Sequence, residues 1–188
     1  MSLRVVPATA ERWDDLCLLF EARGPRGGSR NAPAYGCWCM YWRHRSLPHG
    51  EQKKRALERL VRKGHEPGLL AYDGAEPVGW VSLGPREDFP HILASPQYRP
   101  REDGGGPAVW SLVCFAVDRP RRGEGIADAL LAAAVEHAFA RDASSLEAYP
   151  HASDPRDYMG HVALFERAGF LPVRETSKRV VMRLDRPR

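Results

Sequence analysis

Between residues 117 and 131 the sequence reads Val117-Asp-Arg-Pro-Arg-Arg-Gly-Glu-Gly-Ile-Ala-Asp-Ala-Leu-Leu131. The segment Ala108–Asp118, which leads into it, is almost entirely apolar, and apolar residues recur at helical spacing over Gly123–Arg141. We therefore predict a buried strand, a glycine-rich turn and a long helix. A helix N-terminus has free N–H groups and a dipole that favours anions, and glycine lets a ligand approach the backbone closely. The stretch is thus predicted to bind a phosphate-bearing ligand.

Two common phosphate-binding motifs fit this stretch less well. A P-loop needs Lys followed by Ser or Thr after its glycines, and Ile126-Ala127 stands there instead. The dinucleotide motif G-x-G-x-x-G would begin at Gly123 and Gly125, but Asp128 occupies its third glycine position. Glu147 does follow at about the distance of 20 residues that this motif favours. Because the unit is not the first strand–helix unit of the chain, NAD or FAD binding is only a minor alternative.

The segments before this stretch predict a helical pair and then a hairpin. Thr9 is expected to cap the first helix, and Asp73–Gly74 is a turn signal between two apolar runs. We read Pro85–Pro107, which is rich in proline, glycine and charge, as a long loop. The predicted elements are a strand at Leu3–Val6, helices up to Ala22 and over Glu51–Lys63, and strands at Gly68–Tyr72 and Pro77–Leu83.

The segments after it complete one mixed α/β sheet. The predicted elements are a strand at Ser145–Tyr149, a helix at Gly160–Ala168, and strands at Phe170–Val173 and Ser177–Leu184. A strand, helix and strand in succession imply a right-handed parallel crossover, whereas the two hairpins imply antiparallel pairs. The sequence therefore predicts a single domain over residues 1–188, with a largely antiparallel sheet around a central parallel βαβ unit.

Composition restricts the classes of function. A length of 188 residues, with 43% hydrophobic and 28% charged residues, suits one soluble globular domain. The net charge of +4 is spread along the chain without a dense basic tract, so no nucleic-acid partner is expected. The sequence shows neither a signal peptide nor an apolar run of about 18 residues, so we expect no membrane segment and a cytoplasmic location. Cys37 and Cys39 lack the spacing of a zinc pair, and no metal is predicted.

Two motifs in the expected order resemble one enzyme family. Arg122-Gly-Glu-Gly125-Ile-Ala127 is similar to the acetyl-CoA loop of GNAT (Gcn5-related N-acetyltransferase) enzymes, whose pattern is Arg/Gln-x-x-Gly-x-Gly/Ala. Downstream, Ala163-Leu-Phe-Glu-Arg-Ala-Gly-Phe170 resembles the A-L-Y-E-K-x-G-F helix end of that family. The order of elements fits along nearly the whole chain. Tyr35–Arg43 further resembles an actinobacterial-type branch with a CWCMYWR-like segment.

The resemblance implies an acetyl-CoA-dependent N-acetyltransferase that acts on the amine of a small-molecule acceptor, and by analogy a homodimer. The pantetheine arm would bond to the backbone of Phe115, Ala116 and Val117. The pyrophosphate would bind the N–H groups of Arg122, Gly123, Glu124, Gly125, Ile126 and Ala127. A protein N-acetyltransferase and a catalytically degenerate acyl-CoA sensor are the alternatives.

The catalytic residues depart from the family pattern. The usual tyrosine of the last helix is Phe165, which has no proton to give and so slightly favours the sensor reading. Tyr158 is our candidate for the acid, although it could serve in stacking, and a thiolate can also leave without an acid. Glu147 is our first candidate for the general base. Further candidates for the base are Glu87, Asp88, His91 and His161.

The aromatic segment is the candidate acceptor site. Trp38, Tyr41 and Trp42 are predicted to line it, where they could stack on a planar or cationic group. The alternative is a hydrophobic plug beneath the loops. Both interpretations require burial, because two neighbouring tryptophans are costly to expose.

Overall fold

The computed structural model of the chain describes residues 3–22, 36–98, 108–153 and 158–187. In this part, seven strands form one sheet in the order β1-β2-β3-β4-β5-β7-β6. Only β4 and β5 pair in parallel, and the other neighbours are antiparallel, which confirms the predicted mixed sheet. The strands are β1 (Leu3–Pro7), β2 (Gly68–Asp73), β3 (Glu76–Pro85), β4 (Val109–Val117), β5 (Ser145–Ala148), β6 (Leu171–Glu175) and β7 (Val180–Asp185).

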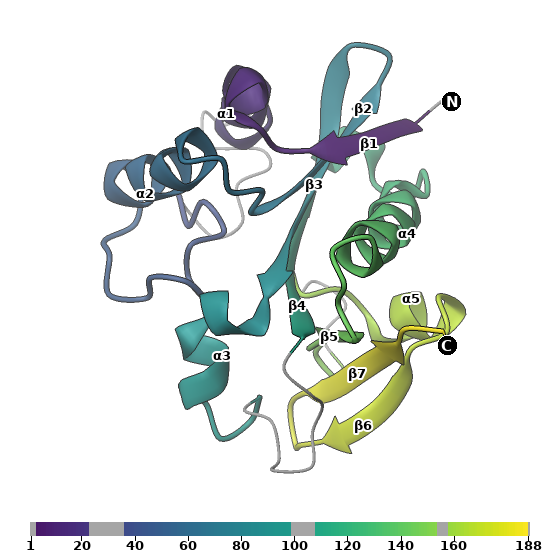
Figure 1. Cartoon of the computed structure of the whole chain (residues 1–188). Helices are drawn as coiled ribbons and strands as arrows, with labels where there is room; N and C mark the ends of the chain where they lie inside the picture. The colour runs from purple at the N-terminus through teal and green to yellow at the C-terminus, as the bar shows by residue number, and fades with distance from the viewer. Residues whose placement is uncertain (1–2, 23–35, 99–107, 154–157, 188) are drawn as a thin grey trace.

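Helices cover both faces of the sheet (Figure 1). They are α1 (Trp13–Glu21), α2 (Glu51–Arg62), α3 (Pro90–Ala94), α4 (Ile126–Phe139) and α5 (Val162–Arg167). One core cluster joins α1, α2 and the segment around Trp38 to the sheet, and a second joins α4 and α5 to its other face. Val113 belongs to the first cluster and Leu112 to the second, so β4 is covered on both sides, as its apolar sequence predicted.

Three local predictions were wrong. Thr9 makes no side-chain cap; its Oγ1 instead accepts a hydrogen bond of 2.9 Å from Arg12, and α1 begins only at Trp13. The predicted loop from residue 85 contains a 3-10 turn and then α3, which has Pro90 in its first turn, where proline favours a helix. Residues 99–107 lie outside the described part. Helix α4 begins at Ile126 rather than Gly123, because the preceding glycines have positive φ.

The sheet opens between β4 and β5. The parallel pairing runs from Val109 with Ser145 to Leu112 with Ala148, and from there to Val117 β4 has no partner among the described strands on this side. The register of β3 and β4 shifts at the same level, so that Val113 has no direct partner on β3. Such a bulge bends its strand. We call the space beside this part of β4, from Val113 to the N-terminus of α4, the gap.

Candidate functional site

The glycine turn lies at the end of this gap that is next to α4. Gly125 is the N-cap residue of α4, with φ 78° and ψ 7°, and Gly123 has φ 89°. These left-handed conformations favour glycine. No described atom lies within 4 Å of the position that a Cβ would take on either glycine. The turn is therefore open, and the first N–H groups of α4 can reach a ligand there.

The two arginines of the turn differ in their contacts. Arg121 lies 2.7 Å from Asp73, 2.7 Å from Glu124 and 3.8 Å from Glu76. The hydrogen bonds to Asp73 and Glu124 raise the pKa of Arg121 further above its ordinary value. Arg122 is exposed, and its Nε donates only a long bond, 3.4 Å, to the carbonyl of Val117. Arg121 thus ties the turn to the β2–β3 hairpin, whereas Arg122 can turn towards an anion.

Along β4, the backbone N–H and C=O groups of successive residues point alternately towards β3 and away from it. Asp118 donates its N–H to Val78 of β3 at 2.9 Å, so Ala116, two residues before it, also faces β3. The groups of Phe115 and Val117 point the other way, into the gap. Of the three backbone positions predicted to hold a pantetheine arm, Phe115 and Val117 therefore point into the gap, and Ala116 points towards β3.

The segment containing Tyr158 crosses the gap. The N–H of Phe115 donates to the carbonyl of Tyr158 at 2.6 Å, and His161 forms a parallel bridge with His151. Tyr158 is 39% exposed. Phe165, by contrast, is fully buried, and its ring centroid lies 6.2 Å from that of Phe115. The role of Tyr158 as acid stays a prediction, and its position beside the open part of β4 agrees with that role.

Glu147 lies in a buried network of hydrogen bonds on the α1–α2 face of the sheet. It is 2% exposed, and its Oε1 accepts from Arg183 Nη2 at 2.6 Å and Nε at 3.1 Å. Its Oε2 accepts from Arg86 Nη1 at 3.2 Å and from Tyr149 Oη at 3.1 Å. Ser111 Oγ lies 2.7 Å from Tyr149 Oη. Since the single proton of Tyr149 goes to Glu147, Ser111 is the donor to Tyr149.

The predicted general base therefore already has both oxygens bonded to neighbouring side chains. Burial, and then the charge of Glu147, raise the pKa of Tyr149 well above its ordinary value, so this hydroxyl keeps its proton. Sequence reasoning missed Tyr149, Ser111, Arg86 and Arg183. A signal for two of them was present, since residues 147 and 149 share a strand face and Ser111 interrupts an apolar strand.

The three predicted acceptor residues separate into two environments. Trp38 is 6% exposed and packs in the core, with its ring centroid 5.9 Å from that of Trp13 and 5.2 Å from that of Phe20. It behaves as the hydrophobic plug that was the alternative reading. Tyr41 and Trp42 are half-buried.

Tyr41 and Trp42 begin a row of aromatic rings. His91 lies 5.0 Å from Tyr41 and 5.2 Å from Trp42, between ring centroids. Trp42 contacts Tyr98 at 5.2 Å, and Tyr98 contacts Tyr149 at 5.7 Å. The row therefore leads from the half-buried aromatic segment to the network of Glu147.

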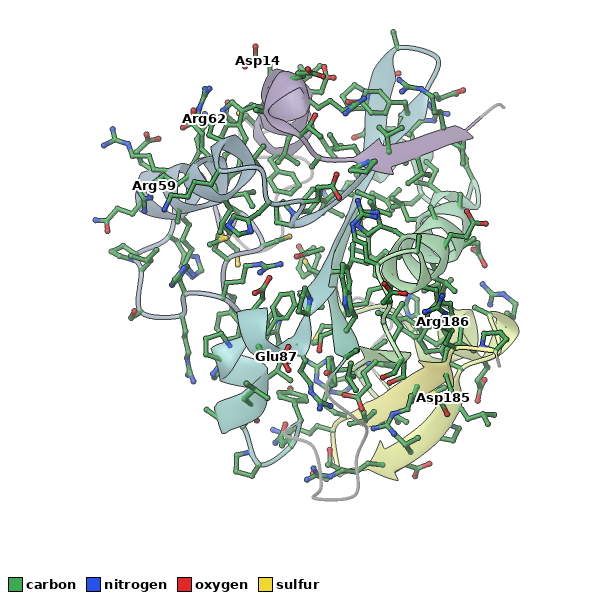
Figure 2. The ribbon with its side chains drawn as sticks, in the orientation of Figure 1. Asp14, Arg59, Arg62, Glu87, Asp185 and Arg186 are labelled. Carbon is green, nitrogen blue, oxygen red and sulfur yellow. The ribbon has the colours of Figure 1, made fainter. Side chains whose placement is uncertain are left out.

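The remaining candidate bases have other settings. Glu87 is exposed on the turn after β3 (Figure 2), and Asp88 accepts a hydrogen bond of 2.7 Å from Arg43. Burial, and then the charge of Arg45, lower the pKa of His91, and His161 is exposed.

Among the described side chains, no group of three His, Cys, Asp or Glu could hold a metal ion. No helix in the described ranges has both the length and the apolar character to cross a membrane.

Comparison with known proteins gives a consistent result. Residues 34–170 match the model of the acetyltransferase (GNAT) family. Similar solved structures include an N-acetyltransferase from Staphylococcus aureus Mu50, with a TM-score of 0.59 and 16% identity over 98% of this chain and 99% of that chain. The PaiA N-acetyltransferase from Thermoplasma acidophilum, in complex with coenzyme A, has a TM-score of 0.52 and 12% identity over 99% and 100%.

A ribosomal-protein-alanine N-acetyltransferase from Brucella melitensis has a TM-score of 0.58 and 22% identity over 97% of this chain and 99% of that chain. At these identities the likeness concerns the fold. No curated protein matches the sequence.

Proposed function

The chain belongs to the GNAT acetyltransferase family, and on this premise we propose that it transfers an acetyl group from acetyl-CoA to the amine of a small-molecule acceptor. One observation carries the proposal. The open glycine turn at the N-terminus of α4 follows directly on β4, at the place where β4 has separated from β5. An anion site thus lies next to backbone groups that a linear ligand could pair with.

The cofactor is proposed to follow β4 and end at the turn. Its pyrophosphate would accept hydrogen bonds from N–H groups over residues 122–127, with the Arg122 side chain as a further donor. Its pantetheine arm would pair with Phe115 and Val117. The N–H of Phe115 is now bonded to the carbonyl of Tyr158 at 2.6 Å, so the arm either displaces that carbonyl or uses the neighbouring groups.

The buried network is proposed to remove the proton of the acceptor amine. Acetyl-CoA, when bound, supplies the acetyl group as a thioester. Glu147 takes up the amine proton through the hydroxyls of Ser111 and Tyr149, which already form a chain to its Oε2. Tyr158 supplies a proton to the departing thiolate. In this proposal Glu147 is the general base, and the hydroxyls of Ser111 and Tyr149 carry the proton to it from the substrate.

The acceptor is proposed to lie along the aromatic row. Tyr41 and Trp42 offer ring faces, and the planes of Trp42 and His91 are nearly parallel, at 28°. Such a surface suits an amine with a flat or cationic body. Trp38 is not part of this proposal, because its ring lies in the core.

A second candidate is an acyl-CoA-binding module without turnover. It is favoured by Phe165, which is fully buried where the family has a tyrosine. It is also favoured by the hydrogen bonds that Arg86 and Arg183 donate to the carboxylate of Glu147. In this case the cofactor would bind in the same gap, but no amine would be acylated.

The experiment is a mass-spectrometric assay of acetyl-CoA consumption with a panel of aromatic amines, polyamines, amino acids and short peptides. Consumption above hydrolysis with a small amine, together with the acetylated product, would support the proposal. Consumption with peptides alone would indicate a protein acceptor. Binding of acetyl-CoA without turnover would favour the second candidate, and failure to bind would overturn both.

A further inference from the structure

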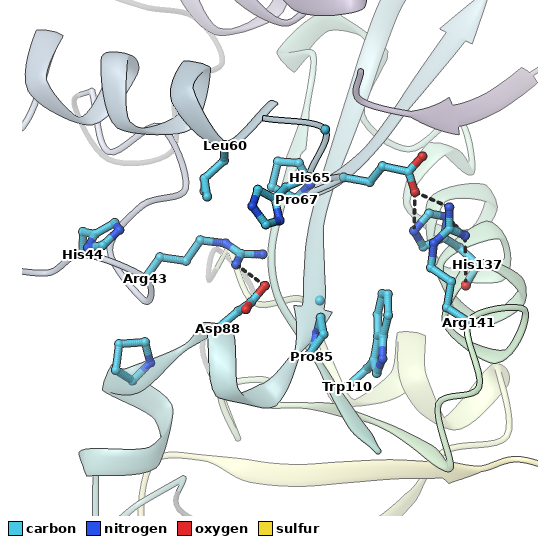
Figure 3. A pocket seen from close by; sticks show the side chains of 14 residues that line it. Arg43, His44, Leu60, His65, Pro67, Pro85, Asp88, Trp110, His137 and Arg141 are labelled. Atoms are coloured by element: carbon cyan, nitrogen blue, oxygen red, sulfur yellow. Dashed lines mark hydrogen bonds and ion pairs between the residues drawn. The ribbon is translucent and has the colours of Figure 1, made fainter. Parts of the chain in front are cut away.

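A pocket of about 480 Å³ lies at the opposite end of β4 from the glycine turn (Figure 3). Trp110, near the start of β4, lines it and stands seven residues before Val117. Along an extended strand this is a distance of roughly 23 Å, so the pocket is separate from the proposed acyl-CoA site. Its volume falls in the range of small-molecule sites, about 300–1,000 Å³.

Arg43 forms one wall of the pocket. It is 7% exposed, its Nη1 donates to Asp88 at 2.7 Å, and its Nη2 donates to the carbonyl of Leu83 at 3.1 Å. A Cβ on Gly84 would lie 3.0 Å from Nη2, so the glycine makes room for the guanidinium. Within the described part of the chain, the buried Nε has no hydrogen-bond partner. A buried donor without an acceptor is costly, and a ligand can supply the acceptor.

His137 of α4 forms the facing wall and is 8% exposed. Its Nδ1 lies 3.1 Å from Arg141 Nη1, and arginine can only donate, so the proton of the neutral ring is on Nε2. Burial, and then the charge of Arg141, lower the pKa of His137, which keeps the ring neutral. Nε2 has no hydrogen-bond partner among the described residues, because Glu66 Oε2 is 3.7 Å away and is bonded to Arg141.

The space between these walls is lined by flat and apolar side chains and by the exposed rings of His44 and His65. Pro67, Pro85 and Leu60 contribute to it, and the Trp110 ring lies 5.9 Å from the His137 ring. Figure 3 shows Arg43 and His137 on opposite sides, with Trp110 on the side of His137. The pocket therefore offers the ring of Trp110 as a flat surface beside one of its two walls.

The charges of the walls restrict the chemistry of that ligand. The two carboxylates, Asp88 and Glu66, are each paired with an arginine, and the two buried side-chain atoms of the pocket that lack a partner among the described residues are both N–H donors. We propose that the pocket binds an organic anion with a flat apolar body and acceptor atoms at both ends, one of them a carboxylate. The carboxylate accepts from Arg43 Nε, and the second acceptor binds His137 Nε2. This ligand is distinct from acyl-CoA and its amine acceptor.

The test uses 6-hydroxy-2-naphthoate as the probe and 6-hydroxy-2-naphthalenemethanol as its uncharged counterpart. Both are titrated into the full-length protein while NMR follows the Arg43 Nε–H and Trp110 indole signals, the latter identified by its loss in Trp110→Phe. The anion is expected to shift both signals saturably, and to bind at least tenfold more tightly than the alcohol. His137→Phe keeps a ring but removes the donor, so it should weaken the binding of the anion at least tenfold.

His49→Phe is the matched control, because His49 is exposed and does not line the pocket. It should bind the anion as the wild type does, and unchanged acetyl-CoA binding by His137→Phe would show that this variant is folded. The proposal is overturned if neither probe gives a saturable shift, as when water alone satisfies the donors. Equal affinity for the alcohol, an unchanged affinity in His137→Phe, or shifts confined to the glycine turn would also overturn it.

Discussion

At the level of single residues, the proposed transfer of the amine proton depends on the hydroxyl of Tyr149. Tyr149→Phe removes the group that connects Ser111 to Glu147 and should lower turnover at least 100-fold, the usual scale of a proton-transfer contribution, about 10²–10⁴. The lost hydrogen bonds should also reduce stability, by about 1–2 kcal/mol. Steady-state kinetics and chemical denaturation measure the two effects, with acetyl-CoA affinity expected to stay unchanged.

Tyr72→Phe is the matched control, since Tyr72 donates to Asp15 at 2.6 Å on a strand away from the gap. It should lose similar stability with no loss of turnover. Equal turnover in the Tyr149 and Tyr72 variants would contradict the proposed path of the proton and leave the network of Glu147 with a structural role alone.

At the scale of elements, the turn between β4 and α4 supplies a sharper test of the cofactor site. Gly125→Ala and Gly74→Ala both place a Cβ at a positive φ, 78° and 61°, with no described atom within 4 Å. Each should therefore lose a similar amount of stability, about 1 kcal/mol. Only the Gly125 variant adds a methyl group where the pyrophosphate is proposed to bind, so calorimetry should show at least a tenfold loss of acetyl-CoA affinity there. Equal affinities would place the cofactor elsewhere.

The elements also show which parts of the structure the sequence predicts. The β4–turn–α4 unit and both hairpins are local patterns of apolar periodicity and turn residues, and they were predicted. Helix α3 was missed because it is only five residues long and lies in a segment rich in proline and charge. The Glu147 network was missed for another reason. It depends on the register that places Ser111 and Arg183 on either side of Glu147, and pairing across three strands cannot be read from local spacing.

At the scale of the whole molecule, two histidines make stability depend on pH. Burial, and then a neighbouring arginine, lower the pKa of both His91 and His137 in the folded chain. Below about pH 6.5 the unfolded chain therefore binds more protons than the folded chain at these sites, so the free energy of unfolding should fall as the pH falls. Above that pH these two histidines do not change the free energy of unfolding with pH.

Urea denaturation between pH 7.5 and 5.5 measures this dependence, about 1.4 kcal/mol for each unit of pKa shift. The variant His137→Phe removes one of the two groups and should flatten the curve. An unchanged slope would mean that His137 titrates in the folded chain as it does in the unfolded chain.

If the chain binds acetyl-CoA between β4 and the N-terminus of α4, this ligand should stabilise the folded chain, and thermal unfolding with acetyl-CoA, NADH and ATP measures that effect. At about a hundredfold its Kd, a ligand stabilises the folded state by about 2.7 kcal/mol. For a domain of this size that corresponds to a rise in Tm of roughly 5–10 °C. We predict such a rise with acetyl-CoA, little with NADH or ATP, and its loss in Gly125→Ala but not in Gly74→Ala. An unchanged Tm with acetyl-CoA, or a larger rise with NADH, would mean that acetyl-CoA is not the ligand of this turn.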